Sequence, residues 1–375
     1  MAALSPRARR AVTLMFLALA VVAATAVYYL RPAPAPKQAS AQPSGVTVPV
    51  TTAGEVVFYD FVSFALGWAA EAVPQRDSPD WPFSIFKTVD GGKHWHRQLS
   101  GHSVVASIVA ETFHFADAGH GFMVAGDPLE LQRTADGGEH WIRRAIPTAN
   151  EVWLEVADAR DLWLLARDGF EPTDPTHLFA SSDAGDTWTQ RSDVPAGFFP
   201  IFRNGAEGWA GGSETGAPVV YTTKDGAQTW ERRDLPAPPQ TTPNPGTTVQ
   251  LLPRSGVVAS VLPTGPGSEI RSYTSFDGGR SWGAVTRPSV GPDAGSTAFQ
   301  DATNWWSIQD GALYKTVDAG RSWSPTAVEP EGLRLLHVFD SRHAWAELGA
   351  GNTSGLAYTS DGGLLWIPTN VPVPD

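Results

Sequence analysis

The sequence predicts an all-β fold, a seven-bladed β-propeller, preceded by one N-terminal transmembrane helix. An octapeptide with the pattern Ser/Thr, any residue, Asp, any residue, Gly, any two residues, Trp recurs seven times, with Ala227 in place of the glycine in one copy. Its aspartates follow one another at intervals of 46, 47, 42, 52, 41 and 43 residues, which is typical of a repeat array. Each interval holds four short strand-like segments, and no long helical periodicity follows the N-terminal segment.

The N-terminal segment predicts a location in the membrane. Arg7, Arg9 and Arg10 precede the uncharged stretch from Ala11 to Leu30, which is long enough to span a bilayer as a helix. Positive charge at its N-terminal side favours a cytoplasmic N-terminus and an extracytoplasmic propeller. The expected organisation is a basic cytoplasmic tail (1–10), a signal anchor (11–30), a linker rich in Pro, Ala and Ser (31–46) and the propeller (47–375).

A cleaved signal peptide is the alternative reading of this segment. Small residues at Ala24–Ala26 and at Ala39–Ala41 resemble cleavage sites, and cleavage would release a secreted protein. The length of the apolar stretch favours an uncleaved anchor, because signal peptides have shorter apolar regions. The arginine pair also bears a weak resemblance to a twin-arginine export signal.

The strand-like segments have the same order in each repeat. In the second repeat the expected strands are 111–117, 121–126, 129–135 and 140–146, with an Asp-Gly-Gly turn between the third and the fourth. Such a turn is a strong hairpin signal. The first and last repeats show the same order, so four antiparallel strands are expected in each blade.

Composition excludes several classes of function. The formal net charge of −12 argues against general nucleic-acid binding, which needs a basic face. The chain has no cysteine, so it has no disulfide framework, no thiolate chemistry and no lipid-bearing N-terminal cysteine. We expect no cofactor.

The octapeptides are expected to stabilise turns. The aspartate carboxylate can accept hydrogen bonds from backbone N–H groups one to three residues on, the Ser or Thr hydroxyl can bond the same backbone, and glycine supplies positive φ. The tryptophan returns on the fourth strand and covers the turn. One carboxylate per copy is too few for Ca²⁺. The structural aspartates are Asp90, Asp136, Asp183, Asp225, Asp277, Asp318 and Asp361, and the tryptophans are Trp95, Trp141, Trp188, Trp230, Trp282, Trp323 and Trp366.

These octapeptides closely resemble the Asp-box, or BNR repeat, found in sialidases, xyloglucan-active glycosidases, sortilin-type receptors and photosynthesis system II assembly factors. The chain is similar to the last family in a further feature, a "GW" element at the second strand, as in "GWAA" from Gly67 and "GWAGG" from Gly208. This resemblance implies a single exported propeller that acts as an assembly factor and binds a membrane-protein client through an arginine-rich patch.

No catalytic or metal site is predicted. Sialidases use an arginine triad and usually open with an Arg-Ile-Pro motif, and this tripeptide does not occur in the sequence. Loops at 76–81 and 167–174 hold carboxylates that could serve a glycosidase, but solvated loops have the same composition. His94 and His96 would lie on one side of a strand, yet two imidazoles without a third ligand are more often solvated side chains. We therefore expect a protein without enzymatic activity.

Two further patterns are candidate binding features. Arginines follow the box tryptophan in the first four repeats, and they are Arg97, Arg143, Arg144, Arg191, Arg232 and Arg233. They could face an anionic partner or block pairing between exposed strand edges. One first-strand position reads Asp60, His114, Glu155, Ile201, Ala298 and His337 across the repeats. Its ionisable members, Asp60, His114, Glu155 and His337, could form a polar ring in the central channel or hydrogen bonds between blades.

The sequence therefore predicts a monomeric, membrane-anchored, non-catalytic propeller that binds a membrane or extracytoplasmic protein client. The alternative is a propeller that binds or cleaves a glycan. Nucleic acid is not an expected partner.

Overall fold

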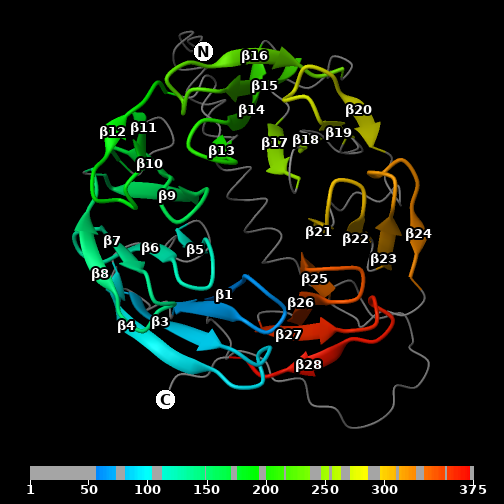
Figure 1. The fold of residues 1–375 in the computed structure, drawn as a ribbon, viewed down its shortest axis with the longest axis horizontal. Helices are drawn as coiled ribbons and strands as arrows, with labels where there is room; N and C mark the ends of the chain where they lie inside the picture. Colours follow the sequence, from blue (N-terminus) through cyan, green and yellow to red (C-terminus); the bar gives the residue numbers. More distant parts are fainter. Residues whose placement is uncertain are drawn as a thin grey trace, which may run out of the picture.

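The computed structural model shows seven four-stranded antiparallel sheets arranged around a central channel (Figure 1). The structure describes residues 56–72, 81–103, 112–147, 149–169, 175–193, 200–214, 217–236, 246–252, 256–262, 271–285, 296–309, 312–326, 333–350 and 353–371. The expected tail, anchor and linker (1–46) lie outside the described residues. Among the described residues, no helix is long and apolar enough to cross a membrane.

Blades 1 to 4 each consist of four consecutive strands. Blade 1 comprises β1 (Val56–Phe61), β2 (Gly67–Ala72), β3 (Trp81–Thr88) and β4 (His96–Ser103). Blade 2 comprises β5 (Phe113–Phe115), β6 (Gly121–Ala125), β7 (Glu130–Thr134) and β8 (Ile142–Ala145). Blade 3 comprises β9 (Glu151–Val156), β10 (Leu162–Arg167), β11 (Thr176–Ser181) and β12 (Thr189–Gln190). Blade 4 comprises β13 (Pro200–Phe202), β14 (Gly208–Glu214), β15 (Ala217–Thr223) and β16 (Glu231–Asp234).

Blades 5 to 7 follow the same plan. Blade 5 comprises β17 (Gly246–Leu251), β18 (Val257–Leu262), β19 (Arg271–Ser275) and β20 (Gly283–Val285). Blade 6 comprises β21 (Ser296–Phe299), β22 (Trp305–Gln309), β23 (Ala312–Thr316) and β24 (Ser324–Pro325). Blade 7 comprises β25 (Leu333–Val338), β26 (Ala344–Ala350), β27 (Thr353–Thr359) and β28 (Ile367–Thr369). The predicted seven-bladed propeller is confirmed.

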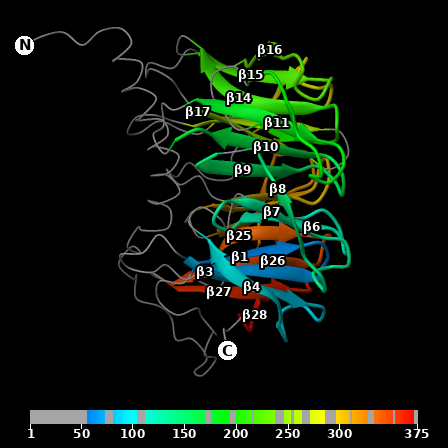
Figure 2. The ribbon, with the colours of Figure 1, turned by 90° about the vertical axis from the view of Figure 1, so that its left-hand side faces the viewer.

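The direction of the strands gives the ring two unlike ends. The first strand of every blade lines the channel and the fourth forms the outer edge (Figure 1). Because neighbouring strands are antiparallel, the turn between the first two strands and the turn between the last two lie at the same end of a blade. That end, at the right of Figure 2, carries all seven octapeptides, and we call it the box face.

The core lies between the blades, and an aromatic stack explains the "GW" element. Trp68 of β2 stacks on Phe115 of β5 with a ring-centroid distance of 3.6 Å, and Trp163 stacks in the same way on Phe202 at 3.8 Å. In blades 1, 2 and 4 the phenylalanine of the first strand also covers the glycine that opens the second strand. A Cβ on Gly121 would lie 2.4 Å from the Phe115 ring. Glycine is required there because any side chain would displace the ring.

The ring closes between blade 7 and blade 1 without a shared strand in the described residues, because each sheet contains four consecutive strands. Trp345 of β26 stacks on Phe61 of β1 at 4.9 Å, and its indole Nε1 donates to the carbonyl of Phe64 at 3.0 Å. At the outer edge, Thr369 donates to the carbonyl of Gly92 and Asn370 to that of Lys93. Side chains therefore hold this junction, which we call the seam.

Candidate functional site

All seven octapeptides form the same hydrogen-bonded turn between the third and fourth strands. The Ser or Thr hydroxyl donates to the aspartate Oδ1 over 2.7–3.0 Å. That hydroxyl also accepts the backbone N–H four residues on, at 2.8–3.1 Å. The aspartate Oδ1 accepts the N–H four residues after itself, at 2.8–3.0 Å. Bonds to the N–H three residues on, within the expected reach of one to three residues, occur in the boxes of blades 5 and 7, and the bond four residues on extends that reach in all seven boxes.

The residue before the tryptophan, which was not predicted from the sequence, completes the turn. In six boxes it is His, Thr or Ser, and its side chain bonds the second carboxylate oxygen of the aspartate. His94 binds Asp90 in this way, so it belongs to the box, whereas His96 is exposed on β4. The recurrence of His, Thr or Ser before Trp was the available signal.

These hydrogen bonds fix the charge of the aspartates. The N–H and the imidazole of His140 hold the pKa of Asp136 at about 2. The hydroxyl and the N–H of Thr187 do the same for Asp183, again to about 2. Each box therefore contains an ionised carboxylate whose oxygens are occupied by its own turn, which is a structural role.

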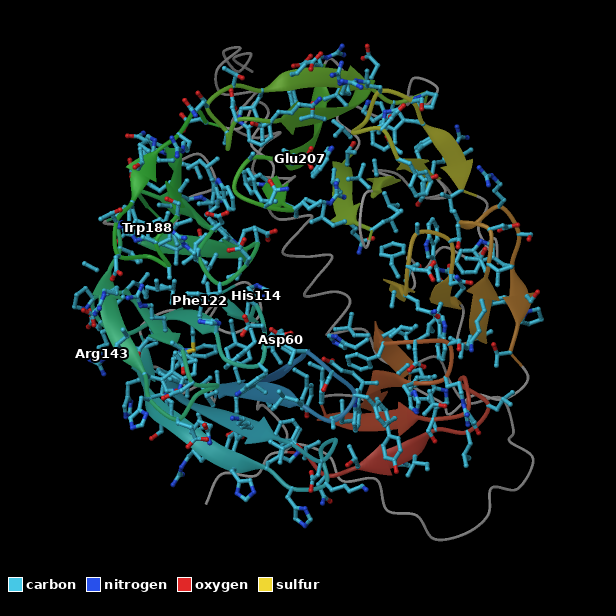
Figure 3. All side chains as sticks on the ribbon, in the orientation of Figure 1. Asp60, His114, Phe122, Arg143, Trp188 and Glu207 are labelled. Atoms are coloured by element: carbon cyan, nitrogen blue, oxygen red, sulfur yellow. The ribbon has the colours of Figure 1, made fainter. Side chains whose placement is uncertain are left out.

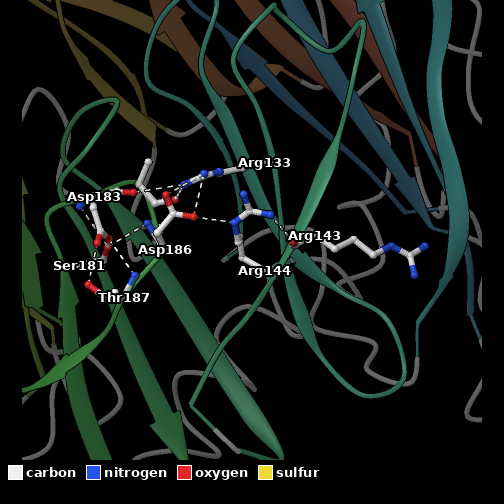
Figure 4. A network of polar contacts seen from close by, with 9 residues as sticks. Arg133, Arg143, Arg144, Ser181, Asp183, Asp186 and Thr187 are labelled. Atoms are coloured by element: carbon white, nitrogen blue, oxygen red, sulfur yellow. Dashed lines mark hydrogen bonds and ion pairs between the residues drawn. The ribbon is translucent and has the colours of Figure 1, made fainter.

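A basic residue before the box, also missed from sequence, joins one blade to the next. Arg133 at the end of β7 donates to the carbonyls of Asp183 and Ala184 and forms a salt bridge with Asp186, all in the box of blade 3 (Figure 4). Lys315 at the same position of blade 6 donates to the carbonyl of Gly362 in the box of blade 7. The box is thus a contact point between blades as well as a turn.

The six candidate arginines lie on the outermost strands or directly after them, as expected, but they belong to two sets. Arg97, Arg143 and Arg232 lie two residues after the box tryptophan and are exposed. Arg144, Arg191 and Arg233 lie three residues after it and are half-buried. Side chains alternate along a strand, so the two sets point to opposite sides of the outer edge.

The half-buried set contacts the protein itself. Arg144 Nε lies 2.5 Å from Asp186 Oδ1 in the box of blade 3, and Arg233 pairs with Glu231. In the exposed set, Arg232 pairs with Glu214 and Asp234, at 2.9 and 2.7 Å. Arg143 is 70% exposed, lies 3.9 Å from Glu130 and points away from the Asp186 network (Figure 4). The exposed set, which we call the outer arginine column, therefore contains the candidate arginines that can face a partner.

The four ionisable residues of the channel position lie on consecutive blades, with His337 on blade 7, Asp60 on blade 1, His114 on blade 2 and Glu155 on blade 3. Asp60 and His114 lie at the channel wall in Figure 3, whereas Arg143 lies at the outer rim. Ile201 and Ala298 occupy the same position on blades 4 and 6. The four ionisable residues therefore cover only part of the ring.

Two of these carboxylates form hydrogen bonds between blades. Asp60 Oδ2 accepts the N–H of Phe115 at 2.6 Å, and Glu155 Oε1 accepts the N–H of Phe202 at 3.0 Å. Burial raises the pKa of Glu155 to about 7, although the N–H of Phe202 opposes this rise. Burial also lowers the pKa of His114 and of His337, against the attraction of Asp60. The geometry supports a role in joining the first strands.

The described residues contain no group of three or more His, Asp or Glu side chains that could hold a metal ion. The carboxylates of the loop at 76–81, Asp77 and Asp80, lie outside the described residues. Of the loop at 167–174, residues 167–169 are described. Arg167 pairs with Glu151 across the blade at 2.5 Å, and Asp168 lies 3.5 Å from His177.

Comparison with known proteins agrees with the fold and with one family. The model of the family "Photosynthesis system II assembly factor YCF48" matches residues 104–232, which span blades 2 to 4 up to Arg232. No curated protein matches the chain significantly.

Solved structures extend the likeness over most of the ring. The structure described as YCF48 bound to D1 peptide has a TM-score of 0.53 at 16% identity and covers 86% of this chain and 100% of its own. YCF48 from Cyanidioschyzon merolae has a TM-score of 0.54 at 15% identity, covering 84% of this chain and 97% of its own. The propeller domain of the Trilobed protease from Pyrococcus furiosus has a TM-score of 0.53 at 11% identity, covering 87% and 99%.

The chain thus resembles the photosynthesis system II assembly factors, in sequence over residues 104–232 and in fold over the ring. The likeness to the protease domain is one of fold only.

Proposed function

We propose that this protein is a non-catalytic assembly factor whose propeller binds a protein client on the extracytoplasmic side of the cytoplasmic membrane, anchored there by residues 11–30. The observation that carries this proposal is that the family match covers blades 2 to 4, the same blades that present Arg143 and Arg232 at their outer edges. A structure with the same fold is described as YCF48 bound to D1 peptide, which supports a peptide segment of a protein as the client.

The outer arginine column is the proposed contact surface for this client. Arg97, Arg143 and Arg232 occupy equivalent positions on blades 1, 2 and 4 and are exposed. On a chain with a net charge of −12, such a local column favours an anionic partner and disfavours a basic one. Exposed charges of this kind govern the rate and specificity of association and weaken with salt.

Affinity capture from membranes, with the full chain as bait, tests the proposal. We would change Arg97, Arg143 and Arg232 to Gln together, which removes charge but leaves the contacts of Arg144 and Arg233 intact. We expect an unchanged melting temperature, loss of the captured protein, and capture by the wild-type chain that weakens as salt rises above physiological strength.

The matched control changes Lys224, Arg271 and Arg342 to Gln, because these are exposed cations outside the column. This control removes the same charge and should retain capture. If the column variant captures the client as well as the wild type does, the column is not the contact surface. If the captured material is a glycan rather than a protein, the proposed function itself is wrong.

A further inference from the structure

The box face carries a concentration of exposed apolar side chains. Of the seven large hydrophobic residues that are exposed among the described residues, five lie in box turns. These five form what we call the apolar arc, and they are Val89 (63% exposed), Phe276 (44%), Val317 (75%), Leu364 (52%) and Leu365 (59%). They come from blades 1, 5, 6 and 7, which are consecutive around the ring (Figure 1).

Basic residues accompany the apolar arc. The sixth position of the box is Lys93 on blade 1, Arg280 on blade 5 and Arg321 on blade 6, and all three are exposed. Three of the four blades thus present one apolar side chain and one cation from the same turn. Blade 7 presents two leucines.

The other three blades have no large apolar side chain at these positions of the box face. At the same two positions, blade 2 has Ala135 and Glu139, and blade 3 has Ser182 and Asp186. Blade 4 has Lys224 and Gln228. On these three blades the polar side chains serve contacts within the ring, since Glu139 lies 3.7 Å from Lys87, Asp186 pairs with Arg133 and Arg144, and Gln228 donates to the carbonyl of Asp225. The hydrogen-bonded turn is the same in all seven boxes, so it does not require the apolar side chains of the other four blades.

We propose that the apolar arc and its cations dock the box face onto the surface of an anionic lipid bilayer. Apolar side chains flanked by Lys and Arg are the pattern of interfacial membrane binding, in which the apolar groups enter the headgroup boundary and the cations attract anionic lipids. A protein with a net charge of −12 would be repelled by such a surface in other orientations, so the half-ring of cations would also orient the propeller.

The turns are suited to this contact. Each is fixed by its box hydrogen bonds, so the apolar side chains are presented on rigid supports. The 25 residues from 31 to 55 that separate the predicted anchor from β1 could extend over about 80 Å. The chain enters β1 at the end opposite the box face, and a segment of this length permits the box face to turn toward the membrane.

The absence of cysteine from the chain allows a direct test with the full-length protein in reconstituted vesicles. We would introduce one cysteine by Val317→Cys and, in a second protein, by Ser182→Cys, which is the equivalent position on blade 3. Each would be labelled with an environment-sensitive fluorophore. Nitroxide groups on the lipid acyl chains would then report contact with the bilayer by quenching.

We expect quenching at position 317 and not at 182, in vesicles that contain phosphatidylglycerol and not in pure phosphatidylcholine. Changing Lys93 or Arg280 to Gln should lower the ratio of docked to undocked protein about fivefold each. Changing Leu364 to Gln and Leu365 to Ser should also reduce docking while the fold is kept. These substitutions copy Gln228 of blade 4 and Ser322 of blade 6, which occupy the same box positions.

Equal quenching at both positions, or at neither, would overturn the proposal. So would a response at position 317 that needs added membrane proteins, which would make the arc a protein-docking surface. A response that rises with protein concentration in the absence of lipid would make it an interface between copies of the chain. None of these outcomes bears on the outer arginine column, which lies on the outer edges of the blades.

Discussion

The seam between blades 7 and 1 and the junction between blades 2 and 3 join equivalent surfaces by different means. The seam is aromatic, and Trp345 contacts both Phe61 and Tyr358 there. The junction packs aliphatic side chains such as Leu131 and Leu162, and Arg133 and Arg144 converge on Asp186 over it. At the junction the chain continues from one blade to the next, whereas at the seam it does not.

This difference indicates where the ring needs specific contacts. Bringing the two ends of a long chain together costs conformational entropy, and at the seam only side chains and turns offset that cost. Large aromatic groups provide much buried area and a defined stacking geometry. The comparison predicts that the seam depends on packing, and the junction in part on charge.

Truncation of the seam tryptophan is expected to have the largest effect. Trp345 is fully buried, and Trp345→Ala removes its stack on Phe61 and its hydrogen bond to Phe64. We expect a loss of about 3–5 kcal/mol in the free energy of unfolding, measured by chemical denaturation.

Trp163→Ala is the matched control within the continuous chain, since Trp163 stacks on Phe202 in the same manner. If the seam has the special role proposed here, Trp345→Ala alone should also broaden the transition and expose blades 1 and 7 to proteolysis. If the two variants unfold with the same breadth of transition and the same proteolysis pattern, the seam has no special role in closing the ring.

Removal of the charged contact at the junction should have a smaller effect that depends on salt. Arg133 is 15% exposed and makes hydrogen bonds to two carbonyls and one carboxylate. Arg133→Met keeps much of the aliphatic length and should cost about 1.5–3 kcal/mol. Its penalty relative to wild type should shrink in high salt, whereas that of Trp345→Ala should not. A penalty for Arg133→Met that is insensitive to salt would contradict the assignment.

Loss of the box hydroxyl at the seam should have a smaller effect still. Thr88 is fully buried and accepts the N–H of Gly92. Thr88→Val leaves this N–H without its acceptor, which should cost about 1–2 kcal/mol. Thr134→Val in blade 2 should cost a similar amount, because the two turns have the same geometry. Thermal melts of both variants would show whether proximity to the seam enlarges the loss.

The channel residues should respond to pH with opposite signs at the seam and at the contact between blades 3 and 4, where Glu155 accepts the N–H of Phe202. Glu155 has a folded-state pKa of about 7, above the ordinary value of the unfolded chain, so the folded state binds more protons and stability falls as pH rises from about 4.5 to 7. His337 at the seam has a lowered pKa. Its contribution to the free energy of unfolding is therefore present above about pH 6.5 and is lost as pH falls.

Glu155→Gln should flatten the decline in melting temperature between about pH 4.5 and 7, and His337→Gln should flatten the loss below about pH 6.5. Because each variant affects a different window, the two serve as controls for each other. A pH profile unchanged in both variants would mean that these residues are solvated in the channel.

The repeat and the blades could be predicted from sequence because each depends on local signals. The expected strand at 121–126 corresponds to β6, and the one at 140–146 contains the shorter β8. The division of the arginines into two sets also follows from strand alternation, counted from the box tryptophan. In blade 5, Val258 replaces the aromatic of the "GW" element, and its partner Gln250 was therefore not recognised as the channel residue.

Contacts between blades could not be predicted in this way. The bond from Arg133 to the next box joins residues about fifty positions apart, and nothing in the local pattern identifies the acceptor. The stack of Trp345 on Phe61 joins residues from opposite ends of the ring. The apolar arc is visible only when the exposed turn positions of seven blades are compared on one face.

Because side chains close the ring, the blade at which the polypeptide begins is arbitrary. Every blade is built from four consecutive strands, and Val371 near the end of the chain packs in the same cluster as Val57 of β1. A circular permutant that joins the two ends of the propeller and begins at blade 3 or blade 5 would retain every sheet. The order of blades in the gene is therefore one of several equivalent linear orders for the same ring. Duplication or loss of whole blades would preserve the same kind of contact between neighbouring blades.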